Sequence, residues 1–165
     1  MIFGMTTATF TLVHVVLSLV GIFSGLVVTF GLITGKRFDG WTAVFLATTV
    51  ATSATGFAFP TDHLLPSQVV GTISLVVLAV AIVARYALHL ASVWRRIYVV
   101  TAVLALYLNF FVLVVQSFLK VPALNALAPT QSEPPFLVAQ VAVMAAFITL
   151  GVLAWRRFHG APVMA

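Results

Sequence analysis

Three amide side chains and the imidazole of His14 lie inside segments of the chain that are mostly apolar. Asn109 and Gln116 are seven residues apart in one such segment, so they share one side of a helix, and Lys120 extends that side. His14 lies in the first apolar segment and Gln140 in the last. An unpaired amide in hydrocarbon is unfavourable by several kcal/mol. His14, Asn109, Gln116 and Gln140 must therefore point toward partners or water, and they are candidates for a polar binding pocket.

The connecting segments add four charged or titratable residues near this level. Asp62 and His63 follow a proline, and Lys120 and Glu133 flank a proline-rich stretch later in the chain. Zinc ligands usually come at tight spacings on one element, and these four do not. We expect Asp62, His63, Lys120 and Glu133 at the mouth of the pocket. Their alternative role is to cap helices and to form surface pairs.

A structural interpretation also accounts for the polar residues inside the apolar segments. The three amides would then make interhelical hydrogen bonds that fix packing, at about 0.6 kcal/mol each. His14 shares a face with Ser18, Gly21 and Gly25. The two glycines form a GxxxG pair, which lets another backbone approach closely. In this interpretation His14 belongs to a packing face and finds a single hydrogen bond.

The composition belongs to the class of membrane proteins. Of 165 residues, 62% are hydrophobic and 7% are charged, whereas soluble domains carry roughly a quarter charged residues. The net charge of +5 comes from basic residues beside apolar segments. Lipid head groups and topology explain this placement, so we expect the lipid bilayer and no nucleic acid as a partner. The lack of cysteine excludes disulfides and Cys-ligated metals.

Five segments reach the roughly 20 mostly apolar residues that a spanning helix needs. They cover residues 9–34, 41–59, 69–91, 97–119 and 136–155. The second is the least apolar, and its many Thr, Ser and Ala residues suit close contact with helices on more than one side. We therefore place it toward the centre. The sequence predicts one all-α domain over residues 1–165, an integral membrane bundle of five transmembrane helices.

The basic residues predict the orientation of this bundle. Seven of the eight fall on one side, and Lys120 is the exception. By the positive-inside rule that side is cytoplasmic, which puts the N-terminus outside and the C-terminus in the cytoplasm. We expect Arg85 to snorkel to the cytoplasmic face. Four aromatic residues fall near the same boundary, as an aromatic belt would: Trp41, Trp94, Tyr98 and Trp155.

The histidines allow an alternative function. His14 and His63 lie on the predicted outer side, and His89 and His159 on the inner side. Paired histidines between helices ligate haem in transmembrane b-type cytochromes. The alternative is thus a b-type haem-binding electron carrier, although His63 and His159 are predicted in loops. No catalytic template such as GxSxG, HExxH or a P-loop is present, which favours a non-enzymatic protein without a cofactor.

Three stretches of the chain are similar to known sequences. They are GWTAVFLATTVATSATGFAFP, VVLAVAIVARY and ALYLNFFVLVVQSFLKVPALNALAPTQSEPPF. With them, residues 12–158 resemble a family of small hypothetical multi-pass inner-membrane proteins of proteobacteria. The resemblance implies a location in the bacterial inner membrane. It implies no activity, cofactor or site residue.

Together these observations predict an integral membrane protein that binds or passes a small molecule, or serves as an accessory subunit of a larger membrane complex. The predicted site is an outward-facing polar pocket between the first, second, fourth and fifth spans. We also expect a homo-oligomer, because five short helices bury little surface within one protomer and GxxxG faces often pair.

Overall fold

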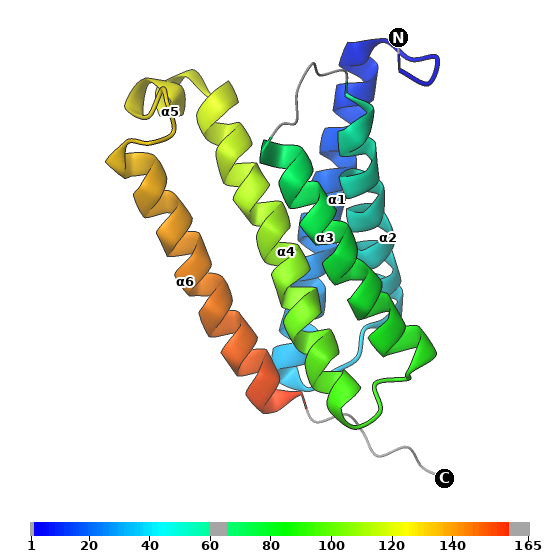
Figure 1. The fold of residues 1–165 in the computed structure, drawn as a ribbon. Helices are drawn as coiled ribbons and strands as arrows, with labels where there is room; N and C mark the ends of the chain where they lie inside the picture. Colours follow the sequence, from blue (N-terminus) through cyan, green and yellow to red (C-terminus); the bar gives the residue numbers. More distant parts are fainter. Residues whose placement is uncertain (1, 60–65, 159–165) are drawn as a thin grey trace.

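The computed structural model describes residues 2–59 and 66–158 and is built from helices (Figure 1). The long helices are α1 (Thr7–Thr34), α2 (Asp39–Thr55), α3 (Pro66–Ile82), α4 (Val93–Lys120) and α6 (Pro134–Arg157). Three short segments complete the fold: the 3-10 turn η1 (Gly56–Ala58), the π-helical segment η2 (Val83–Ala87) and α5 (Pro122–Leu127). The prediction of an all-α bundle is confirmed.

Four helices of the described chain are long and apolar enough to cross a membrane. They are α1, α3 together with η2, α4 and α6, with lengths from 22 to 28 residues. These helices indicate a multi-pass membrane protein. Helix α2 has 17 residues and is not among the four. Each of the five predicted segments coincides with a helix to within a few residues, but the count of five spans stays a prediction.

The ends of the helices follow from local sequence. Helix α1 ends at Gly35, whose φ of 71° is left-handed, and the Gly35 N–H bonds the carbonyls of Gly31 and Leu32. Glycine adopts this conformation without a steric penalty, so it is a common helix stop. Two further features differ from the prediction. The third helix ends through a π turn at Ala87 rather than at residue 91, and the proline-rich connection contains α5, which begins at Pro122.

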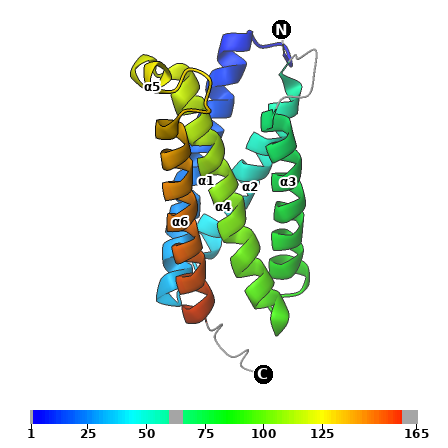
Figure 2. The same cartoon turned by 60° about the vertical axis from the view of Figure 1, so that its left-hand side comes forward.

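Long helices that follow one another in the sequence run antiparallel, α1 and α6 are in parallel contact, and α4 lies among α1, α3 and α6 (Figures 1 and 2). We call the end of the bundle where α1 begins the upper end and the end where α6 finishes the lower end, as drawn in Figure 1. Helix α6 buries one narrow strip, formed by Phe136, Gln140, Phe147 and Ala154. The spacings of four and seven residues put these side chains on one face, and the rest of α6 exposes apolar side chains.

The glycine pair of α1 lets three helices meet closely inside the chain. Gly21 and Gly25 are both buried, and they face side chains of α2 and α4. A Cβ added to Gly25 would lie 2.6 Å from Leu106 Cδ1 and 2.8 Å from Phe45 Cε2. Any side chain at this position would collide with the core. The GxxxG face is therefore filled within the protomer, and a second copy would have to use another surface.

This packing predicts that Gly25→Ala destabilises the bundle. Phe45 and Leu106 are 1% and 0% exposed, so they have no free space into which to retreat from a new methyl group. Overpacking a core costs typically about 1–3 kcal/mol. We expect a lower midpoint of thermal unfolding in detergent, measured by circular dichroism. Gly40→Ala is the matched control, because nothing lies within 4 Å of a Cβ there. An unchanged midpoint for Gly25→Ala would contradict the close approach.

Candidate functional site

A charge cluster with a buried arginine occupies the lower end of the bundle. The Arg85 side chain is 5% exposed and forms an ion pair with the carboxylate of Asp39, the first residue of α2. Its guanidinium carbon lies 5.3 Å from the centre of the Tyr98 ring, a cation–π contact. Arg85 thus turns inward, and the expectation that it snorkels to the membrane face is wrong. Tyr98 is fully buried and is not part of an aromatic belt.

The π turn of η2 explains why Arg85 points into the bundle. A π turn changes the register of side chains relative to a regular α-helix, and such turns are frequent at functional sites. Within η2, Ala84 and Arg85 are buried while Tyr86 and Ala87 are exposed. The sequence carries no clear signal for a π turn, so hydropathy alone could not orient Arg85.

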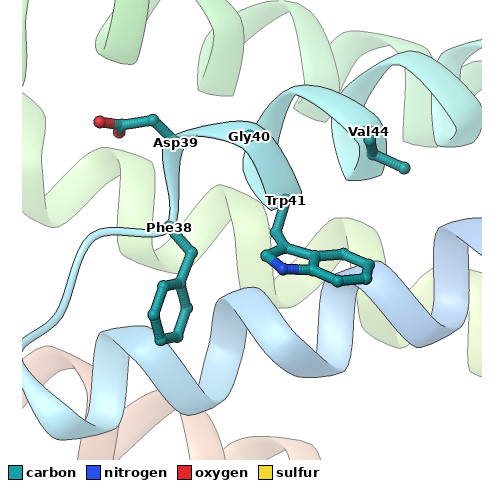
Figure 3. A pocket seen from close by; sticks show the side chains of 5 residues that line it. All are labelled: Phe38, Asp39, Gly40, Trp41 and Val44. Carbon is teal, nitrogen blue, oxygen red and sulfur yellow. The ribbon is translucent and has the colours of Figure 1, made fainter.

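A shallow open hollow of about 360 Å³ lies beside this cluster and is lined by Phe38, Asp39, Gly40, Trp41 and Val44 (Figure 3). Figure 3 shows the Asp39 carboxylate pointing away from the rings of Phe38 and Trp41. That carboxylate pairs with Arg85. The hollow is therefore an apolar surface feature, and its one charged side chain, Asp39, is the ion-pair partner of Arg85.

A second polar group lies in the middle of the bundle, around Gly21. A Cβ added to Gly21 would lie 3.1 Å from Thr49 Oγ1, 3.2 Å from Thr48 Oγ1 and 3.3 Å from Asn109 Nδ2. Two helices besides α1 therefore direct polar atoms at one point. Thr49 is fully buried, and neither Thr49 Oγ1 nor Asn109 Nδ2 has a hydrogen-bond partner within the described residues. Asn109 is one of the predicted pocket residues.

The unpaired hydroxyls stand out against their neighbours on the same helix. Thr42, Thr48 and Thr55 each donate to the carbonyl four residues earlier, at 2.7–2.9 Å. A threonine hydroxyl within an apolar helix usually makes this hydrogen bond to the backbone of its own helix. Thr49 and Thr52 make no such bond, and their buried hydroxyls have no partner within the described chain. A buried polar group without a hydrogen bond lowers the stability of the fold by about 1–3 kcal/mol. The burial of these two hydroxyls therefore requires an explanation.

His14 lies near the upper end of the same seam between α1 and α2. Its Nδ1 is 2.8 Å from Thr55 Oγ1, and its ring meets Phe59 edge-on at 5.3 Å between centroids. Thr55 already donates its hydroxyl proton to the Ala51 carbonyl. The Thr55 oxygen must therefore accept from His14 Nδ1–H, which leaves Nε2 of the neutral ring with a free lone pair. No partner of Nε2 is found among residues 2–59 and 66–158.

The remaining predicted pocket residues lie elsewhere. Gln140 Nε2 donates to the Phe111 carbonyl at 3.3 Å and so ties α6 to α4, while Gln140 Oε1 is buried without a described partner. Gln116 and Lys120 are exposed. The four pocket residues thus lie at separate places in the bundle: the α1–α2 seam, the centre, the α4–α6 seam and the surface. Asp62 and His63 lie outside the described residues.

Glu133 closes the loop before α6. Its carboxylate accepts hydrogen bonds from the Thr130 hydroxyl at 2.9 Å, the Thr130 N–H at 3.2 Å and the Ser132 N–H at 3.1 Å. Partial desolvation acts to raise the pKa of Glu133, but these hydrogen bonds outweigh it and hold the pKa below its ordinary value of 4.5. Gln131 Nε2 also donates to the Val115 carbonyl at 2.8 Å. Glu133 is therefore part of a structured loop anchored on α4.

The described histidines do not form a pair. His14 lies near the start of α1, whereas His89 belongs to the connection between η2 and α4 at the opposite end of the bundle. His63 and His159 lie outside the described residues. Among residues 2–59 and 66–158, no three His, Cys, Asp or Glu side chains gather where they could hold a metal ion.

One arrangement connects the polar groups that remain. Along α2, from its upper to its lower end, the polar residues are Thr55, Thr52, Thr49, Thr42 and Asp39. The three buried ones, Thr42, Thr49 and Thr52, share one face, and Thr55 and Asp39 lie to either side of it. Other helices add polar partners along this helix: His14, Asn109, Tyr98 and Arg85. We call these nine residues the polar line. It runs from the upper to the lower end of α2. The spacing of the α2 threonines in the sequence indicates this line, but from sequence alone we expected these residues only to pack closely against other helices.

The ion pair predicts that Asp39→Asn lowers stability more than a comparable surface change. The variant would leave the Arg85 guanidinium buried without a counter-charge. We expect a loss below the roughly 3–5 kcal/mol that follows removal of one partner from a fully buried pair, because Asp39 is 69% exposed. Arg37→Gln is the control, since Arg37 lies 3.6 Å from the same carboxylate and is 49% exposed. Equal effects of the two variants in thermal unfolding would contradict a special role of Arg85.

The Glu133 loop predicts a pH-dependent local stability. A carboxylate whose pKa is lowered by folding contributes fully above its ordinary value, and this contribution is lost as the pH falls through the lowered one. We expect the hydrogen-exchange protection factors of the Thr130 and Ser132 amides to fall below pH 4.5. In Glu133→Gln they should be lower throughout and lack this step. A step of the same size in the variant would assign the titration to another group.

Comparison with known proteins adds no assignment to this geometry. No family model, curated protein or solved structure matches the chain. A function for this protein therefore has to be argued from the polar line and the helices that enclose it.

Proposed function

We propose that this chain is a non-enzymatic bacterial inner-membrane protein with five spans that passes a small polar species across the membrane along the polar line. The upper end of the bundle is then outside and the lower end is cytoplasmic. The basic residues support this orientation. Seven of them belong to segments at the lower end of the bundle (Figure 1): Lys36 and Arg37 before α2, Arg85 in η2, Arg95 and Arg96 in the first turn of α4, and Arg156 and Arg157 at the end of α6. The positive-inside rule places such an excess of basic residues on the cytoplasmic face.

The position of α2 supports a fifth span. Its 17 residues rise about 26 Å, and η1 extends it toward the roughly 30 Å of a hydrocarbon core. It packs along α1 from the Phe38–Gly31 contact near its start to the Thr55–His14 hydrogen bond at its end. Its buried side chains include three threonines, which α1 and its other neighbours screen from lipid. A helix enclosed in this way can cross without a strongly apolar sequence.

The observation that carries the proposal is the pair of unpaired polar atoms beside Gly21. Thr49 Oγ1 and Asn109 Nδ2 are buried near the middle of the bundle and approach one point from two helices. Buried polar groups in native proteins are nearly always hydrogen-bonded, and exceptions frequently have a functional reason. A polar species that binds between them during passage supplies the missing hydrogen bonds. Packing alone gives no such reason, because valine would fill the space of Thr49 without an unpaired hydroxyl.

Close packing around Gly21 favours a species of the size of water. Two hydroxyl oxygens and one amide nitrogen approach the backbone of α1 there, within 3.1–3.3 Å of the position that a Cβ would occupy. Hydroxyls both donate and accept, and the Asn109 amide nitrogen donates, so together they can hydrogen-bond water molecules along which a proton moves. The polar line has a titratable imidazole, His14, near its upper end and the exposed Asp39 side chain at its lower end.

Proton flux into liposomes tests the proposal. With the purified protein in liposomes that contain a pH-sensitive dye, we expect faster proton entry than in protein-free liposomes under an imposed pH gradient and with a potassium ionophore. Thr49→Val and Asn109→Leu should each slow entry several-fold. Gln116→Leu is the matched control, because Gln116 is exposed and lies off the polar line. Wild-type flux at the protein-free level, or equal flux in all three variants, would overturn the proposal.

Stability provides an independent test of the same residues. Thr49→Val keeps the shape of the side chain and removes a buried hydroxyl that has no described partner. Such a change is neutral or stabilising when the hydroxyl makes no hydrogen bond. We therefore expect Thr49→Val to leave the thermal midpoint in detergent unchanged or higher while it slows proton flux. A clear loss of stability would show that Thr49 Oγ1 serves packing instead.

A further inference from the structure

The polar line is interrupted at one level. Between Thr49 and Thr42, the face of α2 carries Phe45 and Leu46, and both are buried. Phe45 is 1% exposed and Leu106 of α4 is 0% exposed. Both side chains press against the backbone of α1 at Gly25, one helical turn below the polar group around Gly21. Apolar side chains from two helices therefore fill the position where the line would continue.

We infer that Phe45 and Leu106, seated against Gly25, form a gate that separates an upper from a lower half of the polar line. The inference rests on the proposed function. The upper half contains His14, Thr55, Thr52, Thr49 and Asn109, and the lower half contains Thr42, Tyr98, Arg85 and Asp39. An apolar constriction offers water and protons no hydrogen-bond partner, so it blocks a path by excluding water.

The geometry at Gly25 is tight enough to close the path. A Cβ placed there would lie 2.6 Å from Leu106 Cδ1 and 2.8 and 2.9 Å from two atoms of the Phe45 ring. The absence of a side chain at residue 25 is what lets both groups reach the backbone of α1. Water-sized species cannot pass this level while the two side chains are seated. Passage requires Phe45 and Leu106 to leave the space beside Gly25.

Polar groups lie on both sides of the constriction, which distinguishes it from ordinary core packing. Above it, the unpaired Thr49 Oγ1 and Asn109 Nδ2 lie beside Gly21. Below it, the Tyr98 hydroxyl lies close to Thr42 and Arg85, yet no described group meets it in hydrogen-bonding geometry. Unpaired buried polar atoms thus occur in both halves of the line. A gate explains why an apolar layer separates the two halves.

The test is the proton-flux assay with side chains of the gate shortened one at a time. We expect Phe45→Ala and Leu106→Ala to raise proton entry several-fold above the wild type. Each has a matched control with the same loss of volume in the core but off the gate. Phe147→Ala shortens a buried ring between α4 and α6, and Leu78→Ala shortens a fully buried leucine of α3 that is not part of the gate. Both controls should leave proton entry at the wild-type rate.

Milder variants keep the test decisive where an alanine variant does not fold. Phe45→Leu and Leu106→Val remove less volume, and both should raise the flux in the same direction. A double variant, Phe45→Leu with Asn109→Leu, should lose the increase, because the path above the gate is then blocked. Retained helicity and an unchanged elution volume in detergent establish that each variant is folded.

The possible outcomes separate the gate from the proposed function. If the wild type conducts and Asn109→Leu slows it, but neither gate position changes the flux, the gate is overturned and the function stands. If Phe147→Ala raises the flux as much as Phe45→Ala, general loosening explains the increase and the gate is overturned. If the wild type does not exceed protein-free liposomes, the proposed function fails and the gate fails with it.

Discussion

The structure depends on the close approach of α1 to α2 and α4 at Gly21 and Gly25. Helices in a bilayer gain little from the hydrophobic effect when they associate, so van der Waals packing at small residues has a large share in holding them together. Gly25 lets Phe45 and Leu106 reach the α1 backbone, and Gly21 lets Thr49 and Asn109 do the same. One pair of glycines therefore creates both the tightest apolar layer of the bundle and the polar group next to it.

The same approach makes it possible to bury polar and charged groups that lipid would reject. Helix α2 has threonines on its inward face, and they remain inside because α1 and its neighbours screen them. Arg85 is held below them by the Asp39 carboxylate and the ring of Tyr98. Burial of a guanidinium is costly without a counter-charge. The ion pair therefore joins the start of α2 to the end of the third helix and stabilises the lower end of the bundle.

The apolar segments predicted the helices well, because a run of about 20 apolar residues has few alternatives to a helix in lipid. The polar residues were harder to place. Asn109 was correctly expected to point inward, and Gln140 does bond another helix. Gln116, seven residues from Asn109, is exposed. Residues seven apart drift by about 20° around a helix, and helix packing changes along its length, so a shared side does not ensure a shared environment.

By itself, the sequence determined that the chain is helical, that several of its helices can cross a membrane, and where each begins and ends to within a few residues. These properties depend on local composition and on capping residues such as Gly35. Only the tertiary structure decided which polar groups meet. Arg85 turns inward through a π turn, and the threonines of α2 face Asn109 because glycines bring three helices together. Such meetings depend on the rotation and register of helices far apart in the sequence, and hydropathy contains no information on either.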